Sequence, residues 1–274
     1  RGSRRATRLA GAMQNNRYDN LTLPLPFPDA LQEFRVETGA LDASSGVHTG
    51  ASVHVVTRSG TNVFHGNAFE FLRNHRFNAT HPFARVRPDG TREDDGLSRN
   101  QFGGTIGGPI MADRLFFFGG YQGTYIRQTP TSNVAFVPTP AMLAGDFTQL
   151  ASPACAGQQL TLRGPLVNNR VDPALFNPAA LNIARKLPST NDPCGRVIFG
   201  QAIDSDEGQS VGRLDFQLAD DHTVFGRYMS TTYMSPPPLR KTPDNLLATS
   251  RGGFDNIAHS LPLGETWVMS SSTV

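Results

Sequence analysis

Residues 97–128 read LSRNQFGGTIGGPIMADRLFFFGGYQGTYIRQ, and this stretch decides the fold. Every second side chain of its first half falls on one face, namely Phe102, Gly104, Ile106, Gly108 and Ile110. A repeat of two is the period of a β-strand. Only residues 111–113 separate this run from a second alternating run at 114–128. The stretch therefore predicts two antiparallel strands joined by a tight turn.

Similar runs occur on both sides of this hairpin, and they predict six strands in all. The expected strands are Val63–Asn74, Leu97–Ile110, Arg114–Gln128, Ser210–Leu218, His222–Met234 and Ile257–Met269, the last one interrupted by Pro262. The connections between them contain 22, 3, 81, 3 and 22 residues. Alternation of tight turns with long loops places all turns at one end and all loops at the other. Outer-membrane barrels are built in this way.

A second interpretation stays open, in which the chain is a soluble β-rich binding or adhesion module with its loops at one end. The connection 129–209 is much longer than the loops usual in that class, which favours the barrel. Aromatic residues near the expected strand ends also favour it, because barrels carry aromatic girdles at the membrane interfaces; these residues are Phe64, Tyr125, Tyr233 and Trp267.

The two faces of the strand at 210–218 differ in polarity. Leu214, Phe216 and Leu218 fall on one face, and Arg213, Asp215 and Gln217 fall on the other. In a barrel, the first three would face lipid and the second three the lumen. On a soluble sheet, the polar face would simply meet water, so alternation alone does not separate the two interpretations.

Composition narrows the possible function classes. The chain has 274 residues with 27 Gly and 20 Pro, which predicts many turns and little helix. A formal net charge of +2 gives no reason to expect nucleic acid as a partner. The sequence contains no run of about 18 apolar residues, so it predicts no transmembrane helix. The chain starts without a methionine and ends directly after an expected strand, so we expect a fragment of a larger protein.

Both cysteines, Cys155 and Cys194, lie within the long connection. In a protein with this strand pattern, the pair suggests a disulfide formed in an oxidising compartment. Two unpaired thiols are the alternative.

No motif predicts catalysis, a metal or a cofactor. Residues 103–108 are glycine-rich but have the wrong spacing for a phosphate loop, and no nucleophile elbow occurs. The seven histidines are scattered. Asp204, Asp206 and Gly208 resemble half of a calcium loop, without its terminal glutamate. A polar turn is the default interpretation there.

Several longer strings resemble the TonB-dependent outer-membrane receptors, specifically their Oar-like branch. They are LQEFRVETGALDASSG at 31–46, GASVHVVTRSGTNVFHG at 50–66, AFEFLRN at 68–74, NQFGGTIGGPI at 100–110, ADRLFFFGGYQG at 112–123, VPTPAMLAGDF at 137–147, FGRY at 225–228 and LGETW at 263–267. The resemblance covers nearly all of residues 31–270, and its motifs are specific only when taken together.

The resemblance implies an all-β protein with about 22 strands around a plugged lumen. Residues 1–62 would be the C-terminal part of the plug domain, with strands at 31–38 and 51–58 and a turn or weak helix at 39–50. Residues 63–274 would be the first barrel strands and external loops. The implied partners are outer-membrane lipid, an unknown ligand and a TonB-type energy-coupling protein, which would bind a segment absent here. No cofactor is expected.

Overall fold

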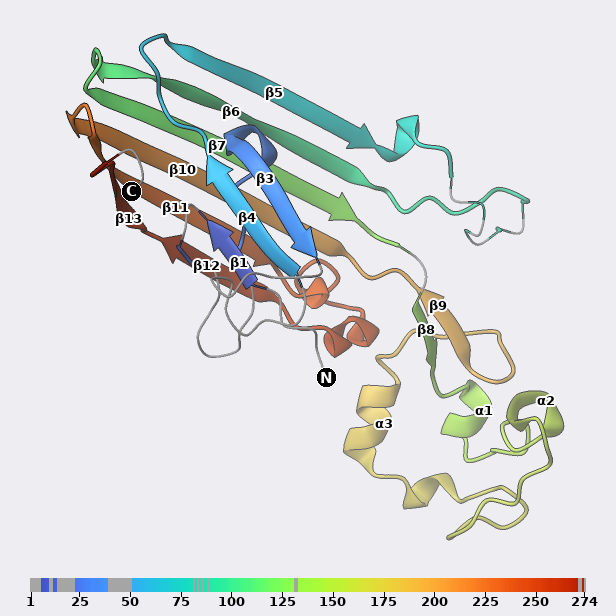
Figure 1. Ribbon diagram of the computed structural model, residues 1–274. Helices are drawn as coiled ribbons and strands as arrows, with labels where there is room; N and C mark the ends of the chain where they lie inside the picture. The colour runs from blue at the N-terminus through green and yellow to red at the C-terminus, as the bar shows by residue number, and fades with distance from the viewer. Residues whose placement is uncertain are drawn as a thin grey trace.

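The chain is seen in a computed structural model that describes residues 6–9, 12–13, 23–38, 51–80, 82, 84, 86–87, 89–130, 133–270 and 273. Its largest part is an antiparallel sheet of seven strands, which we call the large sheet (Figure 1). Its strands are β5 (His65–Asn74), β6 (Ser98–Met111), β7 (Leu115–Gln128), β10 (Ile203–Ala219), β11 (His222–Ser235), β12 (Phe254–Ser260) and β13 (Leu263–Trp267).

The spatial order of the large sheet is β12-β11-β10-β7-β6-β5, and β13 also pairs with β11. β12 and β13 thus pair with successive parts of β11 along the same edge, and Leu261 and Pro262 interrupt them. At this break the Arg227 N–H still donates to the carbonyl of Pro262 at 3.0 Å. Sequential strands are neighbours throughout, as in a meander. Within the described residues the sheet stays open, with β5 at one edge and β12 and β13 at the other. The fold is therefore an all-β partial barrel.

The connections follow the expected alternation. The turns at 112–114 and 220–221 lie at one end of the strands, and the connections at 75–97, 129–202 and 236–253 lie at the other (Figure 1). One expectation was wrong: β10 begins at Ile203 and not at Ser210, so the longest connection ends at residue 202. Asp204, Asp206 and Gly208 consequently belong to a strand, not to a polar turn.

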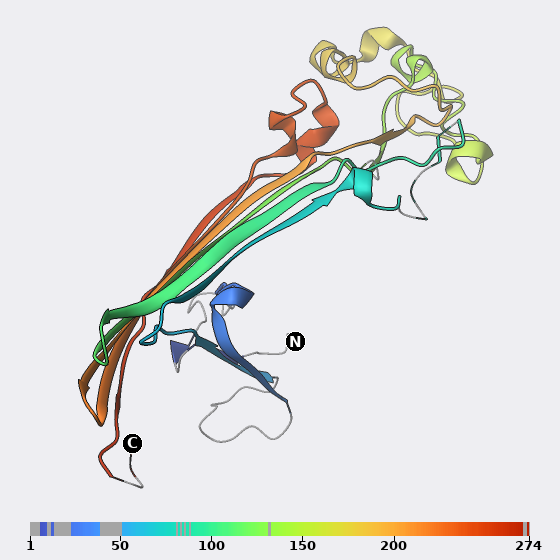
Figure 2. The same cartoon turned by 90° about the horizontal axis from the view of Figure 1, so that it is seen from above.

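A second, mixed sheet, which we call the small sheet, lies against one face of the large sheet (Figure 2). Its order is β2-β1-β4-β3, from the strands β1 (Ala6–Leu9), β2 (Ala12–Met13), β3 (Leu31–Thr38) and β4 (Ala51–Thr57), with the short 3-10 helix η1 (Pro28–Ala30) before β3. β1 and β4 pair in parallel. The expected turn or helix at 39–50 lies outside the described residues.

The hydrophobic core lies between the two sheets. Phe27, Ala30 and Val55 from the side of the small sheet pack against Phe118, Val211 and Met229 of the large sheet. Close approach is possible because position 120 is a glycine: a Cβ there would lie 2.8 Å from the Phe27 ring. The face of the large sheet that carries Phe118, Val211 and Met229 is called the inner face below.

The long connection folds into a separate unit at the end of the strands, which we call the cap, residues 133–199 (Figure 2). A ribbon of β8 (Asn133–Phe136) and β9 (Arg196–Phe199) forms its base. The rest of the cap contains four short helices, α1 (Pro140–Leu143), α2 (Pro153–Ala156), η4 (Pro173–Leu175) and α3 (Pro178–Ala184). Each of these helices starts with a proline, which suits the first helical position because its N–H is not needed there.

Three further 3-10 helices lie in the other two long connections. η3 (His75–Phe77) follows β5, and η5 (Pro238–Arg240) and η6 (Leu246–Ser250) lie between β11 and β12.

Candidate functional site

An ion pair on the inner face joins the large sheet to the small sheet. The Arg213 guanidinium donates through Nε and Nη2 to the Asp215 carboxylate, at 2.9 and 2.7 Å. Its third nitrogen, Nη1, donates to the Thr57 carbonyl of β4 at 3.0 Å. Only 14% and 11% of the two charged side chains are exposed. A bidentate pair in this setting fixes both the direction of the arginine and the position of β4.

Gln209 makes a second connection between the sheets. Its amide oxygen accepts from the Phe27 N–H at 2.5 Å, and its amide nitrogen donates to the Leu25 carbonyl at 2.9 Å. The same nitrogen donates to the Thr231 hydroxyl at 3.0 Å. Gln209 is only 4% exposed. The inner face therefore provides directed bonds to the backbone that precedes η1 and β3.

On the opposite face, the last part of β10 is apolar and uncovered. Leu214, Phe216 and Leu218 are 52%, 36% and 45% exposed. The four aromatic residues noted near the strand ends, Phe64, Tyr125, Tyr233 and Trp267, are exposed as well. Gln217 lies near the turn after β10, where its amide donates to the Ala219 carbonyl and accepts from the Thr223 hydroxyl.

The carboxylates of the half calcium motif already have cationic partners. Lys241 Nζ lies 2.5 Å from Asp204 Oδ2, and Arg127 Nη1 lies 2.5 Å from Asp206 Oδ1. These pairs fasten the start of β10 to β7 and to the connection that holds η5. Among the described residues, no group of three or more potential metal ligands gathers in one place.

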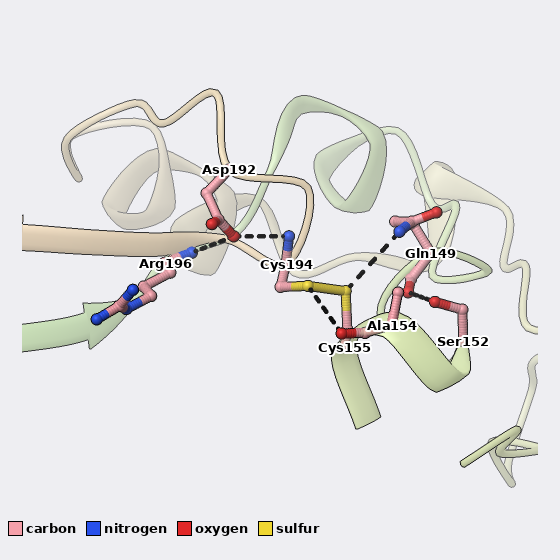
Figure 3. The surroundings of a disulfide bond; sticks show 7 residues. All are labelled: Gln149, Ser152, Ala154, Cys155, Asp192, Cys194 and Arg196. Atoms are coloured by element: carbon pink, nitrogen blue, oxygen red, sulfur yellow. Dashed lines mark hydrogen bonds between the residues drawn. A yellow bond between two sulfur atoms is a disulfide. The ribbon is translucent and has the colours of Figure 1, made fainter. Parts of the chain in front are cut away.

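The cap is braced by a disulfide between Cys155 and Cys194 (Figure 3). The bridge joins α2 to the segment before β9, over a sequence separation of 39. Asp192 shapes that segment, because its carboxylate accepts from the backbone N–H groups of Cys194 and Arg196 at 2.9 and 3.1 Å. The disulfide thus closes a long chain segment into one compact unit.

A concave apolar pocket of about 380 Å³ lies in the cap. Its lining comes from β8, α1, α3 and the segments between them, and includes Phe136, Met142, Phe147, Phe176 and Leu181. Phe147 and Phe176 meet edge to face, with ring centroids 6.4 Å apart. The lining has no charged residue, and its one amide, that of Asn177, accepts from N–H groups at the start of α3. A site of this size and composition suits an apolar group.

Two carboxylates in the long connections have lowered pKa values. The Thr148 hydroxyl and N–H both donate to Asp146, and Arg170 adds a further contact, so the pKa of Asp146 is held below its ordinary value. The Gly96 N–H, together with the side chain of His75, lowers the pKa of Asp94 in the same manner. Both carboxylates are therefore ionised at neutral pH.

The sequence did not single out Gln209, Thr57 or Arg227 as important residues. Gln209 and Thr57 take part in hydrogen bonds between segments far apart in sequence, and no local sequence pattern predicts such bonds. Arg227 could have been noticed, because it occupies the same face of β11 as Phe225 and Met229. A charged residue between two large apolar residues on one strand face is the signal that the sequence offers.

Comparison with known proteins agrees with this architecture. A family model described as "Outer membrane beta barrel domain" matches residues 56–274. The TonB-dependent transporter Oar of Myxococcus xanthus is 33% identical over 104 residues, a match that covers 37% of this chain and 10% of Oar. The chain thus spans only a small part of that relative's length. No solved structure matches the chain.

These comparisons place the chain among proteins of the outer membrane. Within the described residues, no helix is long and apolar enough to cross a membrane. The chain resembles Oar over part of its length, and it belongs to the outer membrane beta barrel domain family, whose location is the outer membrane.

Proposed function

We propose that this chain is part of an outer-membrane active transporter, in which the large sheet is barrel wall and the small sheet is plug. The observation that carries the proposal is the asymmetry of the large sheet. Its inner face binds β4 through Arg213 and the segment before β3 through Gln209, whereas its other face leaves Leu214 and Phe216 uncovered. A plugged barrel needs this arrangement, because lipid lies outside it and the plug inside.

On this proposal, Leu214, Phe216 and Leu218 face lipid, and Arg213, Asp215 and Gln217 belong to the lumen side. Residues 1–62 form the C-terminal part of the plug domain, and residues 63–274 form barrel strands and external loops. A TonB-type coupling protein is the energy source that the Oar-like resemblance implies.

The cap is the proposed ligand-contact region. It lies at the end of the strands where all long connections gather (Figure 2), which is the external end in an outer-membrane barrel. Its pocket is apolar and braced by the disulfide, so the site is formed before a ligand arrives.

Removal of the small sheet tests the plug assignment without knowledge of the ligand. Residues 6–57, which contain all four strands of the small sheet, would be deleted from the intact outer-membrane protein. Conductance would be recorded in planar bilayers, together with the sensitivity of cells to vancomycin. We expect both to rise, because the lumen would open. An unchanged conductance in correctly inserted protein would exclude the plug role.

A matched control removes the cap instead. Asn133 and Phe199 are paired across β8 and β9, so a short linker can replace residues 134–198 without stretching the chain. We expect this variant to keep the low conductance of the complete protein. A large increase would mean that the cap, and not the small sheet, closes the lumen.

A further inference from the structure

Arg227 is the largest fully buried side chain of the described residues, with an exposure of 1%. Its three guanidinium nitrogens, Nε, Nη1 and Nη2, have no hydrogen-bond partner there. An arginine keeps its positive charge in any protein environment, so it does not escape burial by losing a proton. A fixed and buried cation without a partner is strongly unfavourable.

The neighbours of Arg227 on β10 do not compensate its positive charge. Arg213 lies directly opposite it in the pairing of β10 with β11, and like charges in that position repel each other. The Asp215 carboxylate is the nearby anion, and both of its oxygens already accept from Arg213. Asp215 therefore compensates the charge of Arg213, and the charge of Arg227 is left uncompensated.

Arg213 is not available to relieve this imbalance by turning. Its Nη1 is held by the Thr57 carbonyl, and its guanidinium carbon lies 4.9 Å from the centre of the Phe225 ring. Along β11, Arg227 stands between Phe225 and Met229, neither of which accepts a charged hydrogen bond. Phe225 and Met229 therefore flank a forked donor without accepting from its N–H groups.

We propose that Arg227 binds a carboxylate at the interface between the large and the small sheet. The planar guanidinium presents paired N–H groups that match the two oxygens of a carboxylate. With this carboxylate bound, Arg213 pairs with Asp215 and Arg227 pairs with the bound carboxylate, so each arginine has one carboxylate partner. The carboxylate comes either from an Asp or Glu side chain of the polypeptide or from a small free acid in the lumen. This inference goes beyond transport itself and does not depend on the identity of the ligand.

The experiment combines one substitution with one probe anion. The complete outer-membrane protein and its Arg227→Met variant would be embedded in lipid, and the apparent Tm would be measured in sodium acetate and in sodium chloride at equal ionic strength. Methionine keeps an unbranched apolar side chain in the same space. Arg73→Met is the control, because it removes one positive charge from an exposed position at the end of β5.

Each outcome has a distinct meaning. If the site takes a free acid, acetate raises the Tm of the unaltered protein by about 3 °C or more and has no effect on Arg227→Met. If the polypeptide supplies the carboxylate, acetate has no effect and Arg227→Met lowers the Tm by a similar amount. Arg73→Met should leave each of these responses in place.

An Arg227→Met protein of equal or higher Tm, with no acetate effect on the unaltered protein, would overturn the proposal. Arg227 would then be an unpaired charge whose removal relieves the fold. This failure is distinct from failure of the plug assignment, which the conductance of the deletion variant decides separately.

Discussion

The large sheet and the cap are held together by different means. The large sheet is ordered by continuous strand pairing and by buried polar bonds to the small sheet, such as that from Arg213 to Thr57. The cap has short helices, a two-stranded ribbon and one disulfide in place of an extended sheet. We infer that the large sheet depends on the burial and pairing of charge, and that the cap depends on covalent closure.

The largest effect should follow the loss of the buried carboxylate on the inner face. In Asp215→Ala, the mostly buried Arg213 loses its bidentate partner, and the free energy of unfolding should fall by roughly 3–5 kcal/mol. Urea unfolding of the protein in lipid measures this. The matched change in the cap is Asp146→Ala, whose partner Arg170 is 67% exposed, and it should barely alter global unfolding. Equal losses in the two variants would contradict the comparison.

A second effect should be confined to the cap. Replacement of both cysteines by serine removes the 155–194 bridge, which in a chain-entropy model stabilises a loop of this length by about 4 kcal/mol. We expect rapid proteolysis within residues 133–199 and an unchanged unfolding midpoint of the large sheet. Mass spectrometry of the fragments would locate the cleavage. If strand unfolding shifted together with the cap, the two regions would form one cooperative unit.

The two faces of β10 should respond differently to the same new charge. Phe216→Arg places a cation on the proposed lipid face and should cost about 2–4 kcal/mol if the position is near the bilayer midplane. Gln217→Arg, one residue further along the strand, should be nearly neutral because the lumen accepts charge. Refolding into lipid measures both. Two equally mild substitutions would count against the assignment of lipid and lumen faces.

The large sheet was largely predictable from sequence, because one side of each strand is apolar and the period of two is then visible. The expected bounds of the strand at 222–234 differ from β11 by one residue, and the break at Pro262 separates β12 from β13. The start of β10 was not predictable in this way. Residues 204–209 have no apolar side chain on either face, and they are ordered by Arg127 and Lys241 from elsewhere in the chain.

The cap was predictable only in outline. The sequence suggested a disulfide within the long connection. The pairing of β8 with β9, however, joins residues about 60 positions apart in sequence, and no period marks those four-residue strands. The pocket likewise arises from apolar residues on several short segments, each of which would be unremarkable alone. Closure by Cys155 and Cys194 brings these segments together.

The smallest effect concerns the pH dependence of the cap. Because the Thr148 hydroxyl and N–H and Arg170 hold the pKa of Asp146 below its ordinary value, the folded cap favours the ionised carboxylate. Its contribution is complete above the pKa of an unfolded aspartate, about 3.9, and is lost as the pH falls through the lower folded value. Hydrogen exchange of residues 146–171 should therefore accelerate modestly below about pH 4. Asp146→Asn should exchange faster at neutral pH and lack this acid-induced increase, while the exchange of β10 and β11 stays the same in both proteins. If the acid-induced increase persisted in Asp146→Asn, another titratable group in the cap would be its cause. The pKa of Asp146 would then not explain the pH dependence of the cap.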